Sequence, residues 1–163
     1  MTEESIRDGI LRCYHDAFRE AAWEVHFDVH RVVPDLAASL DASPTAVQRE
    51  HNRLVRKGLL DSPPNSRTTH ALSPAGLEAV EERDGGTVLA TDAVETLRET
   101  LAAFERDHPG EYADPDEAFE SVGEGAVARR AYWYLWKRGE VDATGRKDPE
   151  GVRLAWPRAE SES

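Results

Sequence analysis

Apolar residues recur every three or four positions through the first part of the chain, a spacing that predicts amphipathic helices. The first helix is expected over about residues 3–22, with charged residues on its remaining faces. Its apolar stripe consists of Ile6, Ile10, Leu11, Tyr14, Ala17, Phe18 and Ala21. Residues 23–28 then alternate apolar and polar side chains, so we expect a short strand or an extended connector there.

Two short helices joined by a polar turn are predicted between residues 30 and 58. The first spans about 30–40 and ends at the turn Asp41-Ala-Ser-Pro44. This turn offers Ser43 or Thr45 as the N-cap of the second helix, and Gly58 ends that helix. The segment therefore predicts a helix-turn-helix.

A β-hairpin is predicted directly after the second helix. The residues Pro63-Pro-Asn-Ser66 have turn chemistry, and residues 67–72 favour a returning strand. Ser73 then caps a further helix whose first residue is Pro74. A hairpin in this position relative to two helices is typical of the wing of a winged helix-turn-helix.

The second half of the chain repeats this order of elements after a break at Asp84-Gly-Gly-Thr87. Helices are predicted over about 92–107, 116–122 and 126–138, and two strands over 140–143 and 152–156 enclose a polar tip. We therefore expect a mainly α fold with small β wings (α+β), made of two winged helix-turn-helix domains. The expected boundaries are 1–84 for the first domain with its N-terminal amphipathic helix, 85–91 for a linker, 92–158 for a second, divergent winged-helix domain and 159–163 for a disordered tail.

Composition changes this picture through its charge. The 163 residues include 32 acidic and 20 basic side chains, a net charge of −12, which by itself opposes binding to nucleic acid. We favour the interpretation that the acidic excess reflects the salt-loaded cytoplasm of a halophilic archaeon, where carboxylates aid solubility. No apolar run is long enough to cross a bilayer and the N-terminus is acidic rather than a signal peptide, so a cytoplasmic protein is expected.

The basic residues gather in two islands, of which the first lies on the second helix of the helix-turn-helix. When Val47 and Leu54 face the core, a set of polar and cationic side chains points outward. Arginine can clasp guanine, and asparagine or glutamine can pair with adenine; the alternative is a solvated helix face with ordinary charge pairs. The expected DNA-binding residues are Ser43, Thr45, Gln48, Arg49, Asn52, Arg53, Arg56, Arg67 and Thr68.

The second island lies on the predicted helix 126–138, which is also rich in aromatic residues. Ala128, Leu135 and either Ala131 or Tyr132 fit an inward face, so Trp133 is expected to point outward. An outward aromatic cluster would pack between the two domains, form a partner or dimer surface, or bind nucleic acid. The residues of this second surface would be Arg129, Arg130, Trp133, Lys137, Arg146 and Lys147.

Residues 30–80 resemble the winged helix-turn-helix of MarR-type and related archaeal transcriptional regulators. The motifs that carry the resemblance are Leu36-Ala-Ala-Ser-Leu40, Ser43-Pro-Thr-Ala-Val47, Leu54-Val-Arg-Lys-Gly-Leu-Leu60 and Leu72-Ser-Pro-Ala-Gly76. The resemblance implies sequence-specific binding of duplex DNA, usually by a dimer, with the second helix in the major groove. Glu50 and His51 depart from the family, which usually has an apolar residue facing inward in at least one of these positions.

These features together predict a function. No catalytic motif, phosphate-binding loop or metal-ligand spacing is present, so neither an enzyme nor a cofactor is expected. The prediction is a regulator of transcription that binds double-stranded DNA, with a homodimer formed through the N-terminal helix or the aromatic helix 126–138. The alternative is a tandem winged-helix module that binds other proteins within a larger assembly and does not bind DNA.

Overall fold

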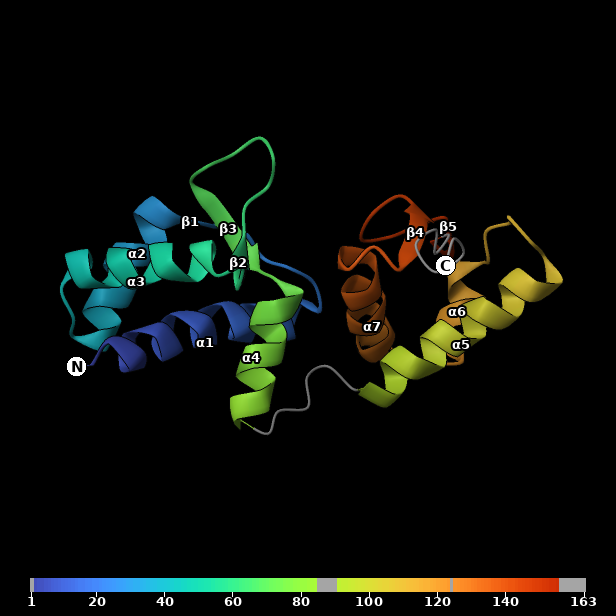
Figure 1. Cartoon of the computed structure of the whole chain (residues 1–163), viewed down its shortest axis with the longest axis horizontal. Helices are drawn as coiled ribbons and strands as arrows, with labels where there is room; N and C mark the ends of the chain where they lie inside the picture. The colour runs from blue at the N-terminus through green and yellow to red at the C-terminus, as the bar shows by residue number, and fades with distance from the viewer. Residues whose placement is uncertain (1, 85–90, 124, 156–163) are drawn as a thin grey trace, which may run out of the picture. The chain divides into compact units, whose positions relative to one another are not determined.

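The computed structural model describes residues 2–84, 91–123 and 125–155 (Figure 1). The chain is mainly helical with small antiparallel sheets, as the sequence predicts, and it divides into two compact units, Met1–Gly86 and Thr87–Ser163. Most of the predicted linker, residues 85–90, and the whole predicted tail, 159–163, lie outside the described residues. Across the described ranges, no helix combines the length and the apolar character that a membrane span requires.

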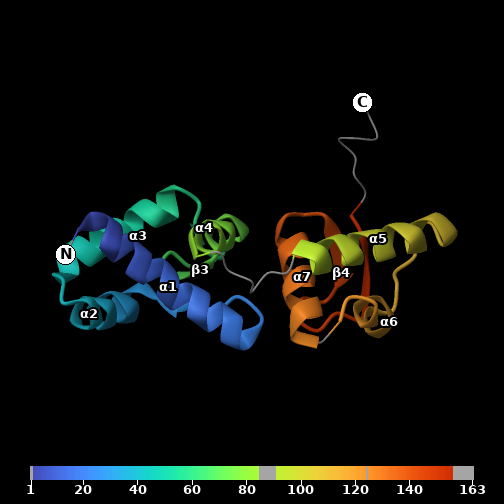
Figure 2. The same cartoon turned by 90° about the horizontal axis from the view of Figure 1, so that it is seen from below.

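The first unit packs three helices around the amphipathic N-terminal helix. Its helices are α1 (Glu3–Ala21), α2 (Val29–Leu40), α3 (Pro44–Arg56) and α4 (Pro74–Asp84), and its strands are β1 (Phe27–Asp28), β2 (Leu60–Asp61) and β3 (Thr69–Leu72). α1 contacts α2, α3, α4 and β3, so its apolar stripe forms the centre of the core (Figure 2). Ile10, Tyr14 and Phe18 have almost no exposed surface there.

Local capping chemistry determines where the helices of this unit begin. Thr2, Asp28 and Ser43 are the N-caps of α1, α2 and α3, and each side chain accepts a hydrogen bond from a backbone N–H in the first turn. Pro44 follows at the first position of α3, where its missing N–H costs nothing. Gly58 has a φ of +78° directly after α3, a conformation that glycine adopts without strain. The turn between α2 and α3 is therefore encoded in the sequence.

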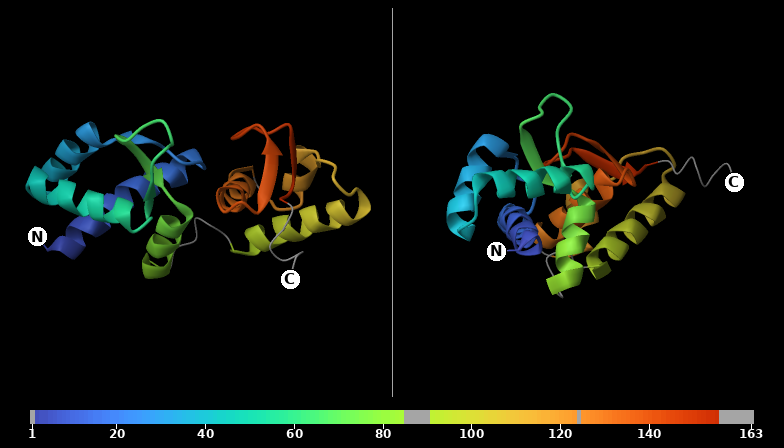
Figure 3. Two further views of the ribbon diagram at one scale, coloured as in Figure 1. Left: turned by 45° about the horizontal axis from the view of Figure 1, so that its top comes forward. Right: turned by 60° about the vertical axis from the view of Figure 1, so that its left-hand side comes forward.

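The sheet of the first unit has the order β1-β3-β2 with antiparallel neighbours. Phe27 pairs with His70 and Leu60 pairs with Leu72, so β3 joins the segment before α2 to the segment after α3. The loop of the β2–β3 hairpin extends beyond the helices of its unit (Figures 1 and 3). Inside this loop the Ser66 hydroxyl accepts hydrogen bonds from the backbone N–H groups of Thr68 and Thr69, both at 3.3 Å.

The motif Leu72-Ser-Pro-Ala-Gly76 joins the end of α3 to the start of α4. The Ser73 hydroxyl donates to the Gly58 carbonyl at 2.6 Å and accepts from the Gly76 N–H at 3.0 Å. A Cβ atom at position 76 would overlap the Leu59 carbonyl oxygen, so only glycine allows the two segments to approach this closely. The motif thus fixes the base of the hairpin against two helices.

The second unit has the same order of elements without a counterpart of α4. Its elements are α5 (Thr91–Asp107), α6 (Pro115–Glu120), α7 (Gly125–Lys137), β4 (Val141–Thr144) and β5 (Gly151–Leu154). β4 and β5 form an antiparallel pair, and an isolated bridge joins Ala113 to Val152 of β5. This bridge corresponds to the β1–β3 pairing of the first unit, because Ala113 lies just before the second helix of its own unit.

Candidate nucleic-acid interface

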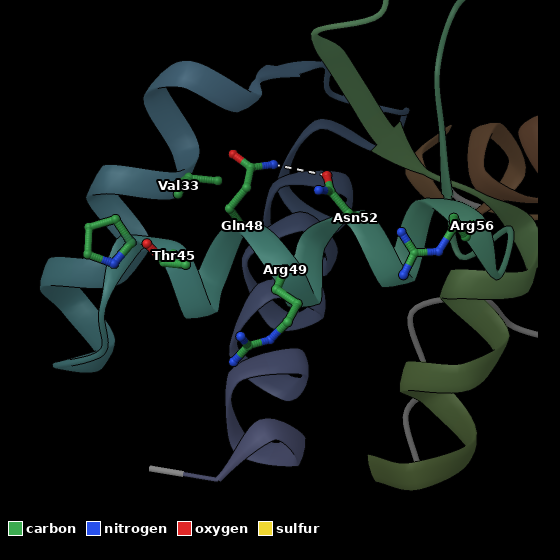
Figure 4. Close-up of a pocket in the computed structure, with 7 residues that line it drawn as sticks. Val33, Thr45, Gln48, Arg49, Asn52 and Arg56 are labelled. Atoms are coloured by element: carbon green, nitrogen blue, oxygen red, sulfur yellow. Dashed lines mark hydrogen bonds between the residues drawn. The ribbon is translucent and has the colours of Figure 1, made fainter.

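The exposed face of α3 brings together most of the residues that the sequence predicts to contact DNA. The opposite face is buried and consists of Val47, Glu50, His51 and Leu54. The outward residues, which are the polar and cationic side chains of Thr45, Gln48, Arg49, Asn52 and Arg56, lie along one side of the helix (Figure 4). Gln48 Nε2 donates a hydrogen bond of 2.9 Å to Asn52 Oδ1, one helical turn further on.

Two hollows adjoin this face, and neither is lined by a carboxylate. One of about 480 Å³ lies between α3 and Val33 of α2, and the other, of about 460 Å³, lies between α3 and the β2–β3 hairpin. Gln48, Asn52 and Arg56 line both, so the two hollows form one continuous surface. The second hollow adds Arg67 and Thr68 from the hairpin loop. The structure therefore places Arg67 and Thr68 of the hairpin beside the residues of α3 that the sequence predicts to contact DNA.

The cations of this surface differ in their partners. Arg56 and Arg67 are exposed and form no ion pair with any residue in the described part of the chain. Arg49 is also exposed, although its Nε lies 3.9 Å from a carboxylate oxygen of Glu50. Arg53 is turned toward α1, where its guanidinium lies 3.6 Å from Glu50 and 3.9 Å from Glu3. The sequence-based expectation that Arg53 points outward with the others is therefore wrong.

Glu50 is a buried carboxylate between α3 and α1. Its side chain has no exposed surface, and its oxygens lie within 4 Å of Arg7, Arg49 and Arg53 but accept no hydrogen bond within the described residues. A buried carboxylate needs neighbouring positive charge, and these three guanidiniums provide it. Glu50 thereby draws Arg53 away from the outward face. Sequence reasoning identified the position as unusual for the family. Its alternative of ordinary charge pairs along the helix included Glu50 with Arg49 and Arg53, but not Arg7 of α1.

A second polar group beneath α3 links the helix to α1 and to the hairpin. The Tyr14 hydroxyl and His51 Nε2 are hydrogen bonded at 2.9 Å, and the His51 ring lies edge-on to the His70 ring with their centroids 5.0 Å apart. Burial lowers the pKa of His51 to about 4, with a smaller contribution from His70, and burial also lowers the pKa of His70. The two imidazoles are thus neutral near pH 7, so they add no charge beneath the outward face of α3.

Ser43 and Thr45 lie at the N-terminal end of α3, where backbone N–H groups and the helix dipole favour an anion. The Ser43 hydroxyl already accepts the Ala46 N–H at 3.1 Å, but it can still donate outward. Both residues are exposed and lie on the same end of the helix as the first hollow. They are suited to a phosphate contact.

The predicted second surface does not form in the way that the sequence indicates. Trp133 has no exposed surface, because α7 contacts α5, α6 and β4 and so buries more than one narrow stripe. The expectation that Trp133 points outward is therefore wrong. Tyr134 and Trp136 are only half-buried, and Arg138 and Arg146 stack over their rings.

The cations of the second unit have acidic neighbours. Arg129 forms a salt bridge of 3.1 Å with Asp148, and the hollow that Arg129 and Lys147 line also contains Asp116 and Glu120. Arg146 lies with Lys147 in the β4–β5 loop, whereas Arg130 and Lys137 are half-buried on α7. Carboxylates therefore lie among the residues of the predicted second surface, in contrast to the outward face of α3.

The described residues contain little that indicates redox or metal chemistry. Burial and the nearby carboxylates of Asp16 and Asp35 raise the pKa of the Cys13 thiol, which favours the protonated thiol over the nucleophilic thiolate. Among the residues that the structure describes, no group of three or more His, Cys, Asp or Glu side chains could hold a metal ion. Comparisons of the chain with protein-family models, curated proteins and solved structures find no match.

Proposed function

We propose that the chain is a transcriptional regulator whose first unit is a winged helix-turn-helix that binds duplex DNA. In this assignment α2 and α3 form the helix-turn-helix, α3 enters the major groove, and the β2–β3 hairpin is the wing. The observation that carries the proposal is the continuous surface from Thr45 to Thr68 that no carboxylate lines, in a chain with a net charge of −12.

Electrostatics explain why this local pattern outweighs the net charge. A phosphate near α3 is within a few ångströms of the surface cations, whereas at physiological ionic strength charges more than about 8 Å away are largely screened. Arg56 and Arg67 have no ion pair with any described residue to give up on binding DNA. They are therefore the strongest candidates for contacts to phosphates, with Ser43 and Thr45 at the start of α3 as additional donors.

The second unit is proposed to be a divergent winged helix, on the basis of its repeated order of elements and the Ala113–Val152 bridge. Arg129 and Lys147 lie beside carboxylates, so we assign DNA binding to the first unit. A homodimer is a further part of the proposal. The large apolar residues of α1 pack within the first unit and Trp133 is buried, so neither provides an exposed apolar surface for a dimer. Light scattering of the whole chain measures whether a homodimer forms.

The first prediction removes Arg56 and Arg67, the cations of this surface that form no ion pair with a described residue. The double variant Arg56→Ala plus Arg67→Ala should bind duplex DNA more weakly than wild type, because two contacts to phosphates are lost. A plot of log affinity against log salt between about 50 and 200 mM KCl should become shallower by about 2 in slope. Fluorescence anisotropy with a pool of random duplexes measures both quantities.

The matched control removes the same charge from the hairpin loop of the second unit. Arg146→Ala plus Lys147→Ala should leave affinity and salt slope close to those of wild type, because Lys147 shares its hollow with Asp116 and Glu120 and Arg146 stacks over the Trp136 ring. Equal losses in both double variants would contradict the assignment to the first unit. No measurable duplex binding by wild type at any salt concentration would favour the protein-interaction alternative.

A further inference from the structure

The amide pair on α3 indicates which base the reading face recognises. Gln48 and Asn52 lie one turn apart in the middle of the outward face, and both line the two hollows beside it. Figure 4 shows the Gln48 amide nitrogen directed at the Asn52 oxygen, with their hydrogen bond of 2.9 Å. Asn52 is exposed and Gln48 is half-buried, so Asn52 is the more accessible member of the pair.

The hydrogen bond leaves Asn52 with a defined set of free donors and acceptors. A side-chain amide has two N–H donors and an oxygen that accepts twice. Because Gln48 occupies one acceptor position of Asn52 Oδ1, the second acceptor position and both Nδ2 hydrogens stay available. The same bond fixes which end of the Asn52 amide carries the oxygen, so the amide is oriented before any ligand binds.

This set complements adenine in the major groove. Adenine presents an acceptor at N7 and a donor at N6, which match an amide N–H and an amide oxygen. Guanine presents two acceptors at N7 and O6, so its O6 would face the Asn52 oxygen without a proton between them. We infer that Asn52, oriented by Gln48, recognises an adenine in the major groove of the bound duplex. The inference rests on the proposed function.

Arg49 and Arg56 lie on the same face, before and after Asn52 along the helix (Figure 4). Arginine contacts guanine or phosphate rather than adenine. The adenine contact is therefore expected at one position in each binding site, and the contacts on either side of it should be to guanine or to the backbone.

The test begins with selection of preferred duplexes from a random library by the wild-type chain. Each adenine of the selected site is then replaced in turn by 7-deazaadenine, which keeps Watson–Crick pairing and lacks the N7 acceptor. Wild type should lose about tenfold or more in affinity at one adenine. Asn52→Ala should bind the unmodified duplex correspondingly less tightly and should be insensitive to the same replacement.

Gln48→Ala and Arg67→Ala are the companion variants. Gln48→Ala should reduce the discrimination between adenine and 7-deazaadenine, because it frees the Asn52 amide to rotate. Arg67→Ala should lower affinity for both duplexes equally, because the wing residue is proposed to contact phosphate. Circular dichroism of each variant checks that it is folded. The duplexes with 7-deazaadenine test the contact to adenine N7 with the wild-type chain, so that arm does not depend on the folding of a variant.

Two results would overturn the inference. If Asn52→Ala still discriminates against 7-deazaadenine as wild type does, or if only Gln48→Ala loses this discrimination, Asn52 is not the adenine reader, although the chain still binds DNA. If wild type selects no duplex at all, the proposed function fails and the inference falls with it.

Discussion

At the scale of single residues, the polar groups beneath α3 determine how its outward face is presented. His51 joins Tyr14 of α1 by a hydrogen bond of 2.9 Å and lies against His70 of β3, and both histidines are buried. An imidazole in this position serves as a neutral hydrogen-bonding group, because a charge there would be desolvated. We therefore expect protonation of His51 to destabilise the packing of α3 against α1 and the hairpin.

His51 predicts how stability depends on pH. Its pKa falls to about 4 in the folded chain, from a value near 6.5 when exposed, so the unfolded chain binds the extra proton between these values. The stability of the first unit should be greatest above about pH 6.5 and should fall by about 2 to 3 kcal/mol on going to about pH 4.5. Urea unfolding across this range measures the effect.

His51→Gln isolates this contribution, since glutamine retains a hydrogen bond to Tyr14 and does not titrate. The variant should lose stability less steeply than wild type between about pH 6.5 and 4.5. His30→Gln, which removes an exposed histidine from the same unit, should behave like wild type. Identical pH profiles for His51→Gln and wild type would disprove a neutral, buried imidazole at position 51.

At the scale of elements, the junction between α3, β3 and α4 determines where the hairpin projects. Ser73 bonds to both Gly58 and Gly76, and its own N–H donates to the Leu59 carbonyl at 3.2 Å. These bonds satisfy the backbone groups at the end of one helix and the beginning of another. The hairpin emerges directly from this junction, so its position relative to α3 follows from the Leu72–Gly76 motif.

Gly76→Ala should destabilise the first unit by about 1 to 3 kcal/mol, because the added methyl group has no space. Its Cβ would overlap the Leu59 carbonyl oxygen and lie 2.8 Å from Leu72 Cδ1. Gly125→Ala is the matched control, since a Cβ at position 125 meets nothing within 4 Å at the start of α7. Thermal unfolding of both variants measures the difference. A Gly76→Ala chain as stable as wild type would mean that α4 approaches Leu59 less closely.

At the scale of the whole molecule, salt should act on folding and on DNA binding in opposite directions. The net charge of −12 makes the carboxylates repel one another, and added salt screens this repulsion. Binding to DNA releases counterions, so added salt weakens it. If the chain binds DNA, it must retain enough contacts to do so at the salt concentration at which it is most stable.

We expect the melting temperature to rise as KCl increases from about 0.1 to 1 M, while duplex affinity falls over the lower part of that range. Differential scanning calorimetry and fluorescence anisotropy on the same samples measure the two trends. Sorbitol at matched osmolality is the control for stabilisation that does not depend on charge. A melting temperature that is insensitive to KCl would contradict the view that repulsion between carboxylates destabilises the folded chain at low salt.

The sequence by itself determined the local structure of this protein. Helix α3 begins after its N-cap Ser43 and ends before Gly58. Both signals act over a few residues and do not depend on distant parts of the chain. Periodicity likewise identified the buried stripe of α1 and the outward position of Arg49 and Asn52. The hairpin followed from the turn chemistry of residues 63–66.

Only the tertiary structure decided which polar residues lie inside and which cations are unpaired. Periodicity identifies the apolar face of a helix but not the number of neighbours around it, which is why the burial of Trp133 was not predicted. Arg53 has one partner on its own helix, Glu50, and a second on α1, Glu3, and the pattern of α3 alone does not indicate where α1 lies. The surface without carboxylates is likewise a property of α3 and the hairpin together, because it forms only where two segments distant in sequence meet.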